Sequence, residues 1–276
     1  MDIYEKIEDF YNTVTAPKTV IGKSVFGRKI FAVKIGDGEP VGIAQYAMHG
    51  REFITARLAL EQYKIGLKCG SCWLIPLVNP DGCLLSETGL ESVENKREKE
   101  RLLALNQGNT DFSLWKANGR GVDLNVNFAA NWGQGAKNVK KAGAENYIGK
   151  KPFSEPETQA LKLFTQKLRP DYTVSYHTKG EEIYWYFHQP IGRCAKDKAL
   201  AEVLSSVTGY KLAYAKNSVG GYKDWCIKTL QIPAFTIEAG ADEFEHPLGT
   251  AAWENVLEHN RRALFCLSGA VKERMC

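Results

Sequence analysis

The residues with the clearest chemical potential are His49 and Glu52, in the segment His-Gly-Arg-Glu. They follow an apolar, strand-like run that ends at Ala47, and a helical pattern follows them. A histidine and a glutamate three residues apart at a strand-to-helix turn can face one centre. Neutral imidazole and carboxylate are both good ligands for Zn²⁺. Taken alone, the pattern equally describes a surface histidine beside a glutamate that favours a helix N-terminus.

His177 supplies a third candidate ligand. It follows the apolar run 172–176, so we expect it at the carboxyl edge of a strand. Ligands gather at this edge in open α/β sheets. The remaining histidines, His188, His246 and His259, are interpreted as surface or core-edge residues.

Glu238 is the candidate catalytic base. A catalytic zinc with three protein ligands keeps a fourth position for water and lowers the pKa of that water to ~7. A neighbouring carboxylate must then accept the proton. Glu238 ends the apolar run 234–237, and Ala-Gly follows, which lets the chain turn. The alternative is an ion-pair partner at the sheet edge.

The elements that position these residues can be predicted from apolar patterning. Short apolar runs alternate with helical patterns, which favours an α/β sheet covered on both faces and a single domain over residues 1–276. Ser154 and Glu157 have the spacing of a capping box. The charged and then polar segment 86–111 carries no strand signal and suits a solvated helix leading into a loop. The strands are expected at 29–35, 41–47, 73–78, 172–176, 183–187 and 234–237, and the helices at 53–65, 155–168, 197–207 and 252–271.

Composition narrows the class of protein. The 276 residues carry a net charge of +4 and have no Lys/Arg block, which argues against a nucleic-acid partner. No apolar stretch approaches the ~18 residues of a membrane span, and the acidic N-terminus does not resemble a signal peptide. The seven cysteines are odd in number and scattered, and Cys69 and Cys72 are interpreted as reduced residues in a turn. We therefore expect a cytoplasmic protein.

Several motifs together resemble the zinc carboxypeptidase family. They occur in one order between residues 49 and 238, and the segment 21–36 also resembles the opening hairpin of that family. The motifs are HGRE (49–52), VNPDG (78–82), GVDLN (121–125), SYH (175–177), GGYKDW (220–225) and FTIE (235–238).

This resemblance implies a three-layer α/β/α fold with a mixed, mostly parallel eight-stranded sheet between helices. It implies one Zn²⁺ per chain on His49, Glu52 and His177, with Glu238 as the base. It also implies a positive side chain that polarises the scissile carbonyl. Lys116 occupies the matching position, and Arg120 is a nearby alternative.

The sequence departs from the family pattern where substrate is bound. The family usually places an arginine after Asn125, where its guanidinium grips the terminal carboxylate of the substrate. This chain has Val126 there, so ordinary exopeptidase specificity is in doubt. The family's mobile tyrosine corresponds to Lys216, and Tyr214 or Tyr222 are candidates to replace it.

The position that lines the specificity pocket corresponds to Lys223, which favours a carboxylate-bearing substrate. Lys179 adds to the same positive field. The run from His177 to Trp185 resembles the bacterial γ-D-glutamyl-diaminopimelate peptidases, which cut cell-wall (murein) peptides. Glu181, Glu182 or Asp224 would then pair with the amine of diaminopimelate.

Other activities remain open. A cytosolic metallocarboxypeptidase acting on C-terminal or side-chain glutamates would also need lysines in its substrate-binding pocket. An acylase on the same scaffold and a non-catalytic member that binds zinc or peptides are further alternatives. The sequence does not indicate an oligomeric state.

Overall fold

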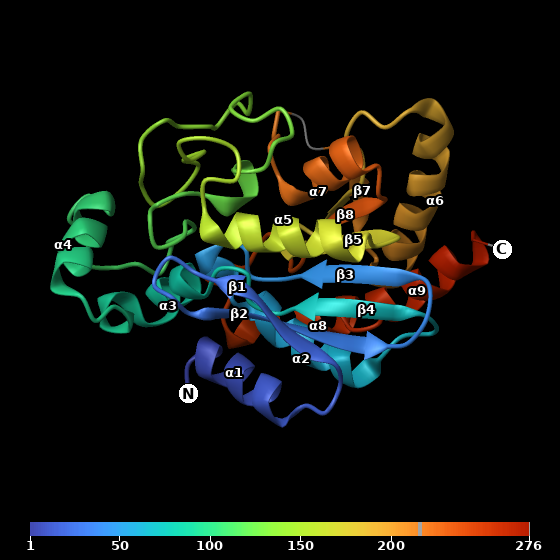
Figure 1. Cartoon of the computed structure of the whole chain (residues 1–276), viewed down its shortest axis with the longest axis horizontal. Helices are drawn as coiled ribbons and strands as arrows, with labels where there is room; N and C mark the ends of the chain where they lie inside the picture. Colours follow the sequence, from blue (N-terminus) through green and yellow to red (C-terminus); the bar gives the residue numbers. More distant parts are fainter. Residues whose placement is uncertain (215–216, 276) are drawn as a thin grey trace.

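The strands of the protein form one mixed sheet in the computed structural model, which describes residues 1–214 and 217–275 (Figure 1). The strand order in this part of the chain is β1-β2-β4-β3-β5-β8-β6-β7. The β3–β4, β3–β5, β5–β8 and β6–β7 pairs are parallel, and the others are antiparallel. The strands are β1 (Lys18–Lys23), β2 (Lys29–Gly36), β3 (Val41–Gln45), β4 (Ser71–Ile75), β5 (Tyr172–His177), β6 (Glu182–Tyr184), β7 (Lys211–Ala213) and β8 (Ala234–Glu238).

Helices cover both faces of the sheet. Helices α2, α6, α8 and α9 bury their apolar side chains in one core cluster around Tyr46, Tyr176 and Phe235. Helices α5 and α7 pack on the opposite face against Ile43 and Ala234. The helices are α1 (Ile3–Thr13), α2 (Ile54–Ile65), α3 (Pro80–Thr88), α4 (Lys96–Leu105), α5 (Pro156–Leu168), α6 (Ile191–Thr208), α7 (Tyr222–Trp225), α8 (Thr250–Asn260) and α9 (Ala263–Glu273).

Most of the expected elements are confirmed, with several corrections. Strands β3 and β6 end earlier than predicted, at Gln45 and Tyr184, and α6 begins earlier, at Ile191. Strand β4 begins two residues earlier than predicted, and the segment up to Val78 leaves the sheet. The expected helix 252–271 is two helices, α8 and α9. The capping box at Ser154 is wrong: α5 has Glu155 as its N-cap, without a side-chain cap. Glu157 instead points inward and accepts from the backbone N–H of Val25.

The carboxyl ends of β3, β5 and β8 meet at one edge of the sheet. The register pairs His177 at the end of β5 with Glu238 at the end of β8. Beyond β3 the chain continues to His49 and the 3₁₀ turn η1 (Gly50–Glu52), which leads into α2. Parallel pairing therefore places three chemically active segments side by side, as the sequence predicts.

Close backbone packing fixes the His49 turn. Asn79 donates from its amide to the carbonyls of Met48 and Ala117, 3.1 Å each. A Cβ on Gly50 would lie 2.4 Å from the carbonyl oxygen of Gly82 and 2.5 Å from that of Trp115. Only glycine fits this approach, so the residue between the ligand histidine and Arg51 is constrained by sterics.

A buried acidic group lies behind the site, at the start of α5. Glu157 is fully buried, and its carboxyl accepts from Val25 N (3.1 Å) and Asn118 Nδ2 (3.1 Å). Burial, and secondarily the nearby Asp81 carboxylate, raises the pKa of Glu157 to about 8. Since the ordinary value is 4.5, the folded protein binds a proton here that the unfolded chain releases.

This predicts that the free energy of unfolding falls as the pH rises from about 4.5 to about 8, and that Glu157→Gln removes much of this fall. Each pKa unit corresponds to about 1.4 kcal/mol, so the effect is on the order of a few kcal/mol. Urea unfolding of both proteins between pH 5 and 9 measures it. Parallel pH profiles for the two proteins would contradict the assignment.

Candidate metal centre and active site

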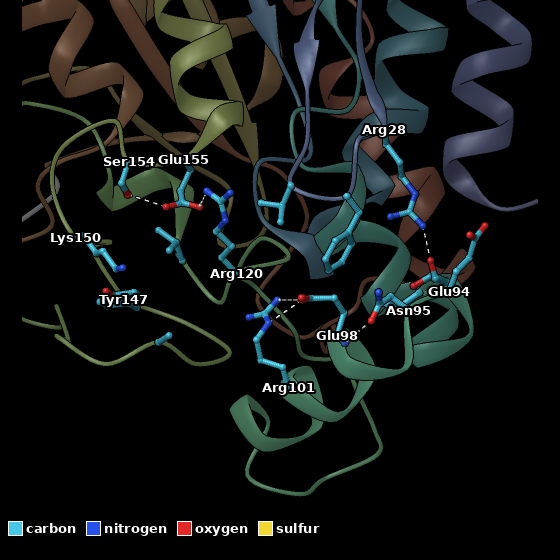
Figure 2. Close-up of a pocket in the computed structure, with 16 residues that line it drawn as sticks. Arg28, Glu94, Asn95, Glu98, Arg101, Arg120, Tyr147, Lys150, Ser154 and Glu155 are labelled. Atoms are coloured by element: carbon cyan, nitrogen blue, oxygen red, sulfur yellow. Dashed lines mark hydrogen bonds and ion pairs between the residues drawn. The ribbon is translucent and has the colours of Figure 1, made fainter.

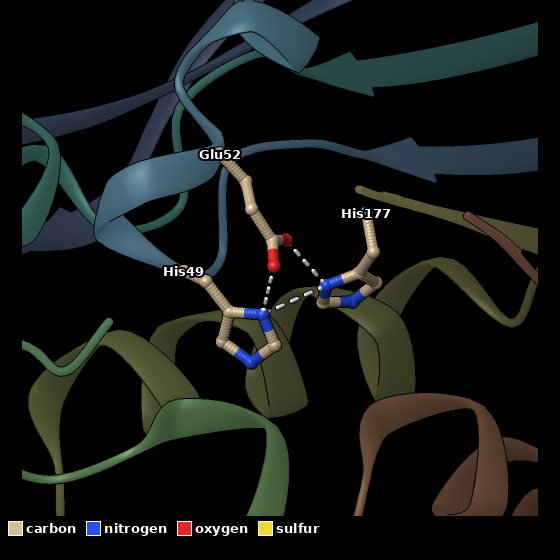
Figure 3. A group of neighbouring side chains, drawn as sticks. All are labelled: His49, Glu52 and His177. Atoms are coloured by element: carbon tan, nitrogen blue, oxygen red, sulfur yellow. Dashed lines mark hydrogen bonds and ion pairs between the residues drawn. The ribbon is translucent and has the colours of Figure 1, made fainter. Parts of the chain in front are cut away.

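Three buried side chains converge at the sheet edge (Figure 3). The two oxygens of Glu52 lie 2.8 Å from Nδ1 of His49 and 2.9 Å from Nδ1 of His177. The two Nδ1 atoms are 3.1 Å apart. One ligand atom from each residue lies within 4.8 Å of the others. The structure thus brings together the three residues predicted as metal ligands.

The charges of the three groups depend on one another. Burial opposes ionisation of Glu52, but the charges of His49 and His177 outweigh it and hold the pKa of this carboxyl well below its usual range. Burial would likewise lower the pKa of His177, and the Glu52 carboxylate reverses that effect and raises it. The Glu52 carboxylate therefore keeps its negative charge at this depth because the two imidazoles stabilise it.

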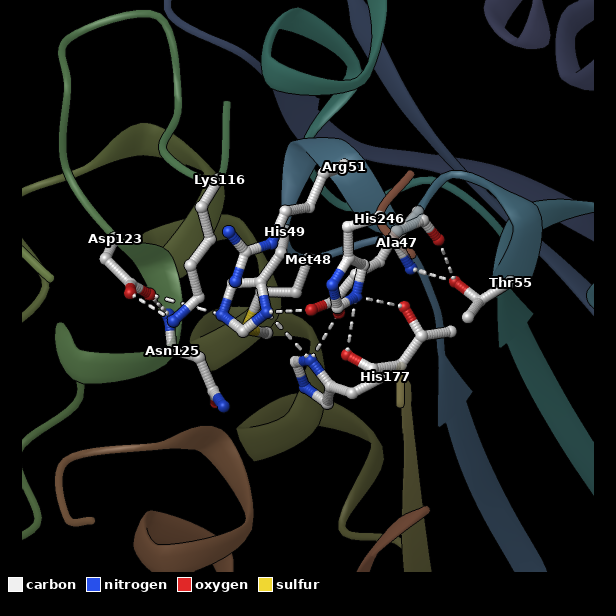
Figure 4. A network of polar contacts seen from close by, with 12 residues as sticks. Ala47, Met48, His49, Arg51, Thr55, Lys116, Asp123, Asn125, His177 and His246 are labelled. Atoms are coloured by element: carbon white, nitrogen blue, oxygen red, sulfur yellow. Dashed lines mark hydrogen bonds and ion pairs between the residues drawn. The ribbon is translucent and has the colours of Figure 1, made fainter. Parts of the chain in front are cut away.

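Asp123 and Lys116 surround His49 (Figure 4). Oδ1 of Asp123 lies 3.2 Å from Nε2 of His49, a close contact although its geometry is not that of a full hydrogen bond. Oδ2 of Asp123 lies 2.8 Å from Nζ of Lys116. Burial would raise the pKa of Asp123, but the charges of Lys116 and then of His49 outweigh this effect. The pKa of Asp123 therefore lies well below its usual range. Burial lowers the pKa of Lys116, but the Asp123 charge raises it overall.

This donor set fits Zn²⁺. Two imidazole nitrogens and a carboxylate are a standard set for catalytic zinc, and a carboxylate behind a ligand histidine is its usual outer partner. The Nδ1 atoms of His49 and His177 face each other at 3.1 Å with the Glu52 carboxylate beside them, so all three groups can offer a lone pair to one divalent cation.

Glu238 lies beside the centre in a cavity of about 450 Å³. Burial raises the pKa of its carboxyl to about 7, while the charge of His177 acts in the opposite direction. A carboxyl with such a pKa can accept and return a proton near neutral pH. The cavity is also lined by Asn125, Glu182, Tyr184, Ala213, Tyr214, Ser218, Gly221, Lys223, Asp224 and Thr236.

Lys223 and Asp224 place both signs of charge in this cavity. Nζ of Lys223 lies 2.6 Å from Oδ1 of Asp224 and donates to the carbonyl of Tyr186 at 3.1 Å. Both residues are buried, and Glu182 adds a second carboxylate nearby. The structure therefore brings Asn125 and Lys223 together with Glu238, as the sequence indicates.

Three of the predicted residues lie outside the Glu238 cavity, namely Arg120, Tyr222 and Lys179. Arg120 lines a separate cavity of about 990 Å³ and pairs with Glu155 at 3.6 Å (Figure 2). Tyr222 is fully buried, and its hydroxyl contacts Thr165 at 2.9 Å, so its ring fills the core. Lys179 donates to the carbonyl of Asp242 outside the Glu238 cavity. Lys216 lies outside the described residues.

Sequence reasoning missed Asp123 and Arg51 as residues of the site, whereas it named Tyr214 as a candidate to replace the family's mobile tyrosine. Asp123 is the central residue of the GVDLN motif. It is fully buried, and a buried aspartate normally has charged partners, as Asp123 does in Lys116 and His49. Arg51 is part of the HGRE motif itself. Tyr214 lines the Glu238 cavity and is half exposed. Attention to charged residues inside the motifs would have found the first two.

Comparison with known proteins agrees with this geometry. Residues 3–251 match the sequence model of the family described as zinc carboxypeptidase. The chain belongs to the zinc carboxypeptidase family. In the described residues no helix is long and apolar enough to cross a membrane.

Two similar proteins have names that refer to γ-D-glutamyl bonds or to murein peptides. The chain is 32% identical over 261 residues to γ-D-glutamyl-L-diamino acid endopeptidase 1 of Lysinibacillus sphaericus, covering 87% of this chain and 64% of that protein. It is 33% identical over 137 residues to murein peptide amidase A of Escherichia coli K12, covering 47% of this chain and 53% of that protein. The chain thus spans less than two thirds of the length of either relative.

Solved structures share the fold. Bovine thrombin-activatable fibrinolysis inhibitor superimposes with a TM-score of 0.78 at 18% identity, covering 99% of this chain and 98% of the other. Murein-tripeptide amidase MpaA of E. coli O157 gives a TM-score of 0.58 at 22% identity, with 95% of each chain covered. The eight-stranded carboxypeptidase-like fold expected from the sequence is confirmed.

We expect Glu238→Gln to retain bound zinc and to lose turnover by about 10²- to 10⁴-fold, because the amide cannot accept a proton. Metal analysis and kcat on any cleaved peptide measure the two effects separately. Loss of zinc in this variant would make Glu238 a ligand and not the base.

Asp123→Asn should weaken zinc affinity or activity by about 10- to 100-fold, because it removes the charge behind His49 and frees Lys116. A competitive chelator titration measures the affinity. An unchanged zinc affinity together with unchanged kcat would show that the contacts of Asp123 are incidental.

Proposed function

We propose that this peptidase hydrolyses the amide bond between a γ-D-glutamyl residue and a diamino acid in murein-derived peptides. The observation that carries the proposal is the mixed charge of the cavity beside Glu238. Lys223 supplies a cation, and Asp224 and Glu182 supply carboxylates. Diaminopimelate ends in one amine and one carboxylate, so its side chain matches this pair of charges.

The buried position of the pair makes it selective. Lys223 and Asp224 are about 6% exposed, where charges are poorly screened and an unpaired charge is costly. A substrate side chain with a single charge would bind one residue of this pair and leave the other without an opposite charge. A zwitterionic end group can accept from Lys223 and donate to Asp224 together.

Val126 further separates this chain from ordinary carboxypeptidases. Its side chain has no donor, so it cannot hold the terminal carboxylate of a substrate as an arginine would. Binding energy must come from elsewhere in the cavity. The names of the L. sphaericus and E. coli relatives support a substrate with a γ-D-glutamyl or murein peptide linkage.

The positions of the residues support the following catalytic roles. Zinc, held by His49, Glu52 and His177, would polarise the scissile carbonyl and acidify the attacking water. Glu238 accepts the proton of the water and delivers it to the leaving amine. Lys116 donates from Nζ to the developing oxyanion, and Asp123 holds that ammonium in place. Arg120 faces another cavity, which favours Lys116 for this role.

A carboxypeptidase that removes C-terminal or side-chain glutamates is the second candidate, favoured by Lys223. The carboxylates of Asp224 and Glu182 beside it would repel such a substrate. One zinc per chain, a single domain, a cytoplasmic location and a role in cell-wall recycling stay predictions.

Purified protein with zinc should cleave L-Ala-γ-D-Glu-diaminopimelate, and a chelator should abolish this activity. The matched tripeptide with L-lysine, which lacks the second carboxylate, should be cleaved at least about tenfold less efficiently, because Lys223 then has no anion to bind. Chromatography of the products measures kcat/KM for each. Cleavage of C-terminal glutamate peptides but of neither tripeptide would contradict the proposal.

A further inference from the structure

A second cavity lies apart from the catalytic centre (Figure 2). Its volume is about 990 Å³, and none of its lining residues lines the cavity beside Glu238. Four segments form its walls: the turn between β1 and β2, residues 92–101 before and within α4, the loop 120–122 and the loop 142–155. This volume lies at the upper end of the range of about 300–1,000 Å³ that small-molecule sites occupy.

Two of the arginines in this cavity are already bound by the protein. Arg28 forms a 2.7 Å ion pair with the buried Asp81. Arg101 forms a 2.6 Å ion pair with Glu98 and donates to the carbonyl of Gly119. Because Arg28 and Arg101 each connect different segments of the chain, we interpret these two arginines as supports of the cavity walls.

Arg120 and Lys150 differ from these two arginines. Arg120 is 53% exposed, and its one ion-pair contact within the described residues, with Glu155, is long at 3.6 Å. The Glu155 carboxyl is already hydrogen-bonded, because Asn118 donates to it at 2.9 Å and Ser154 at 2.7 Å. Lys150 is exposed and forms no ion pair with any residue that the structure describes. Two cations of this cavity are therefore available to a ligand.

The loops that carry these two cations are held by hydrogen bonds. The side-chain oxygen of Asn118 accepts from the backbone N–H of Arg120 at 3.0 Å. The backbone N–H of Asp123 donates to the carbonyl of Tyr147 at 2.9 Å, which attaches the segment of Lys150 to the same loop. Because both backbones are ordered without a ligand, binding has a lower entropic cost.

The surroundings of the two cations indicate the chemistry of the ligand. Val93 and Val122 are buried apolar residues of the wall, and Phe26 and Tyr147 add aromatic rings. Such a surface suits a ligand with an apolar or amide body. On the other side of the cavity in Figure 2, Glu94 is an exposed carboxylate. It would repel a ligand that is negative along its whole length, such as a polyphosphate.

We propose that this cavity is a second ligand site, which binds a small acidic peptide with at least two carboxylates at Arg120 and Lys150. The planar guanidinium of Arg120 can bind one carboxylate through two parallel N–H groups, and the ammonium of Lys150 can bind a second. The amide and methylene groups of the peptide pack against the apolar wall. The site lies outside the catalytic cavity, so the inference does not depend on which peptide the enzyme cleaves.

The experiment uses N-acetyl-D-Glu-D-Glu as the acidic probe and N-acetyl-D-Gln-D-Gln amide as its neutral counterpart. The D configuration limits cleavage during the measurement. Each peptide, and inorganic phosphate as a third probe, is titrated into zinc-loaded protein labelled with ¹⁵N. The shifts of the backbone amide signals give both the place of binding and the Kd.

The wild type is compared with Arg120→Gln, Lys150→Gln, the double variant and the control Lys141→Gln. Lys141 is an exposed lysine of the same loop as Lys150, and it does not line the cavity. Ala142→Trp tests the shape of the site, because a large ring at this half-buried position narrows the cavity without removing a charge. Zinc content and melting temperature are measured for every variant.

The acidic peptide should shift the amides of residues 119–122 and 147–150 in a saturable manner, and the neutral peptide should not. Each single charge variant should raise the Kd about fivefold and the double variant on the order of 20-fold, because each change removes one largely exposed charge pair. Ala142→Trp should also weaken binding, and Lys141→Gln should leave it unchanged. Binding at the Glu238 cavity would shift a different set of amides, in residues 182–184 and 221–224.

Three results would overturn the inference: no saturable shifts at residues 119–122 and 147–150, equal binding of the neutral peptide, or an unchanged Kd in the folded double variant. Phosphate that binds at the same amides at least as tightly as the acidic peptide would also overturn it, since the site would then select a compact oxyanion. If the double variant fails to fold, the single variants decide, because an unchanged Kd in both would exclude the two assigned residues. None of these outcomes bears on the proposed function, which cleavage assays test.

Discussion

The site depends on one buried interaction, the carboxylate of Glu52 held between the imidazoles of His49 and His177. Each of the three groups would be costly at this depth by itself, because burial disfavours charge and leaves polar atoms unpaired. Together they form a compact set of donors with Nδ1 atoms and carboxylate oxygens about 3 Å apart. The carboxyl ends of the parallel strands β3 and β5 bring the three residues together at this edge of the sheet. Asn79 and Gly50 fix the turn after β3 that carries His49.

The charged groups differ between the two sides of these three residues. In our account this difference sets the orientation in which a peptide substrate binds. Toward β8 and β6 lie Glu238 and a cavity of mixed charge. Toward β3 lie Lys116, locked by Asp123, and the loosely paired Arg51. In our account the cavity beside Glu238 receives the leaving amine.

The strand ends of the centre could be predicted because apolar runs are local signals, whereas the complete ligand set followed from the resemblance of six ordered motifs to the zinc carboxypeptidase family. His177 and Glu238 could be placed at strand ends from six-residue windows, and the register between them followed from parallel pairing. The errors arose where tertiary packing overrides a local pattern. Glu157 has capping-box spacing but turns into the core, where Asn118 and Val25 bind it. Tyr222 sits next to the cavity residue Gly221, yet it packs against Phe128 and Trp225. Helix phase at such positions is set by neighbours that are distant in sequence.

The central claim is that one divalent ion is held by these three side chains. Anomalous diffraction from a zinc-loaded crystal, recorded on both sides of the zinc edge, tests it most directly. The account predicts a single strong peak per chain, about 2.0–2.2 Å from Nδ1 of His49, Nδ1 of His177 and the carboxylate of Glu52. A protein that retains zinc but shows the peak on other residues, with these imidazoles turned apart, would contradict it.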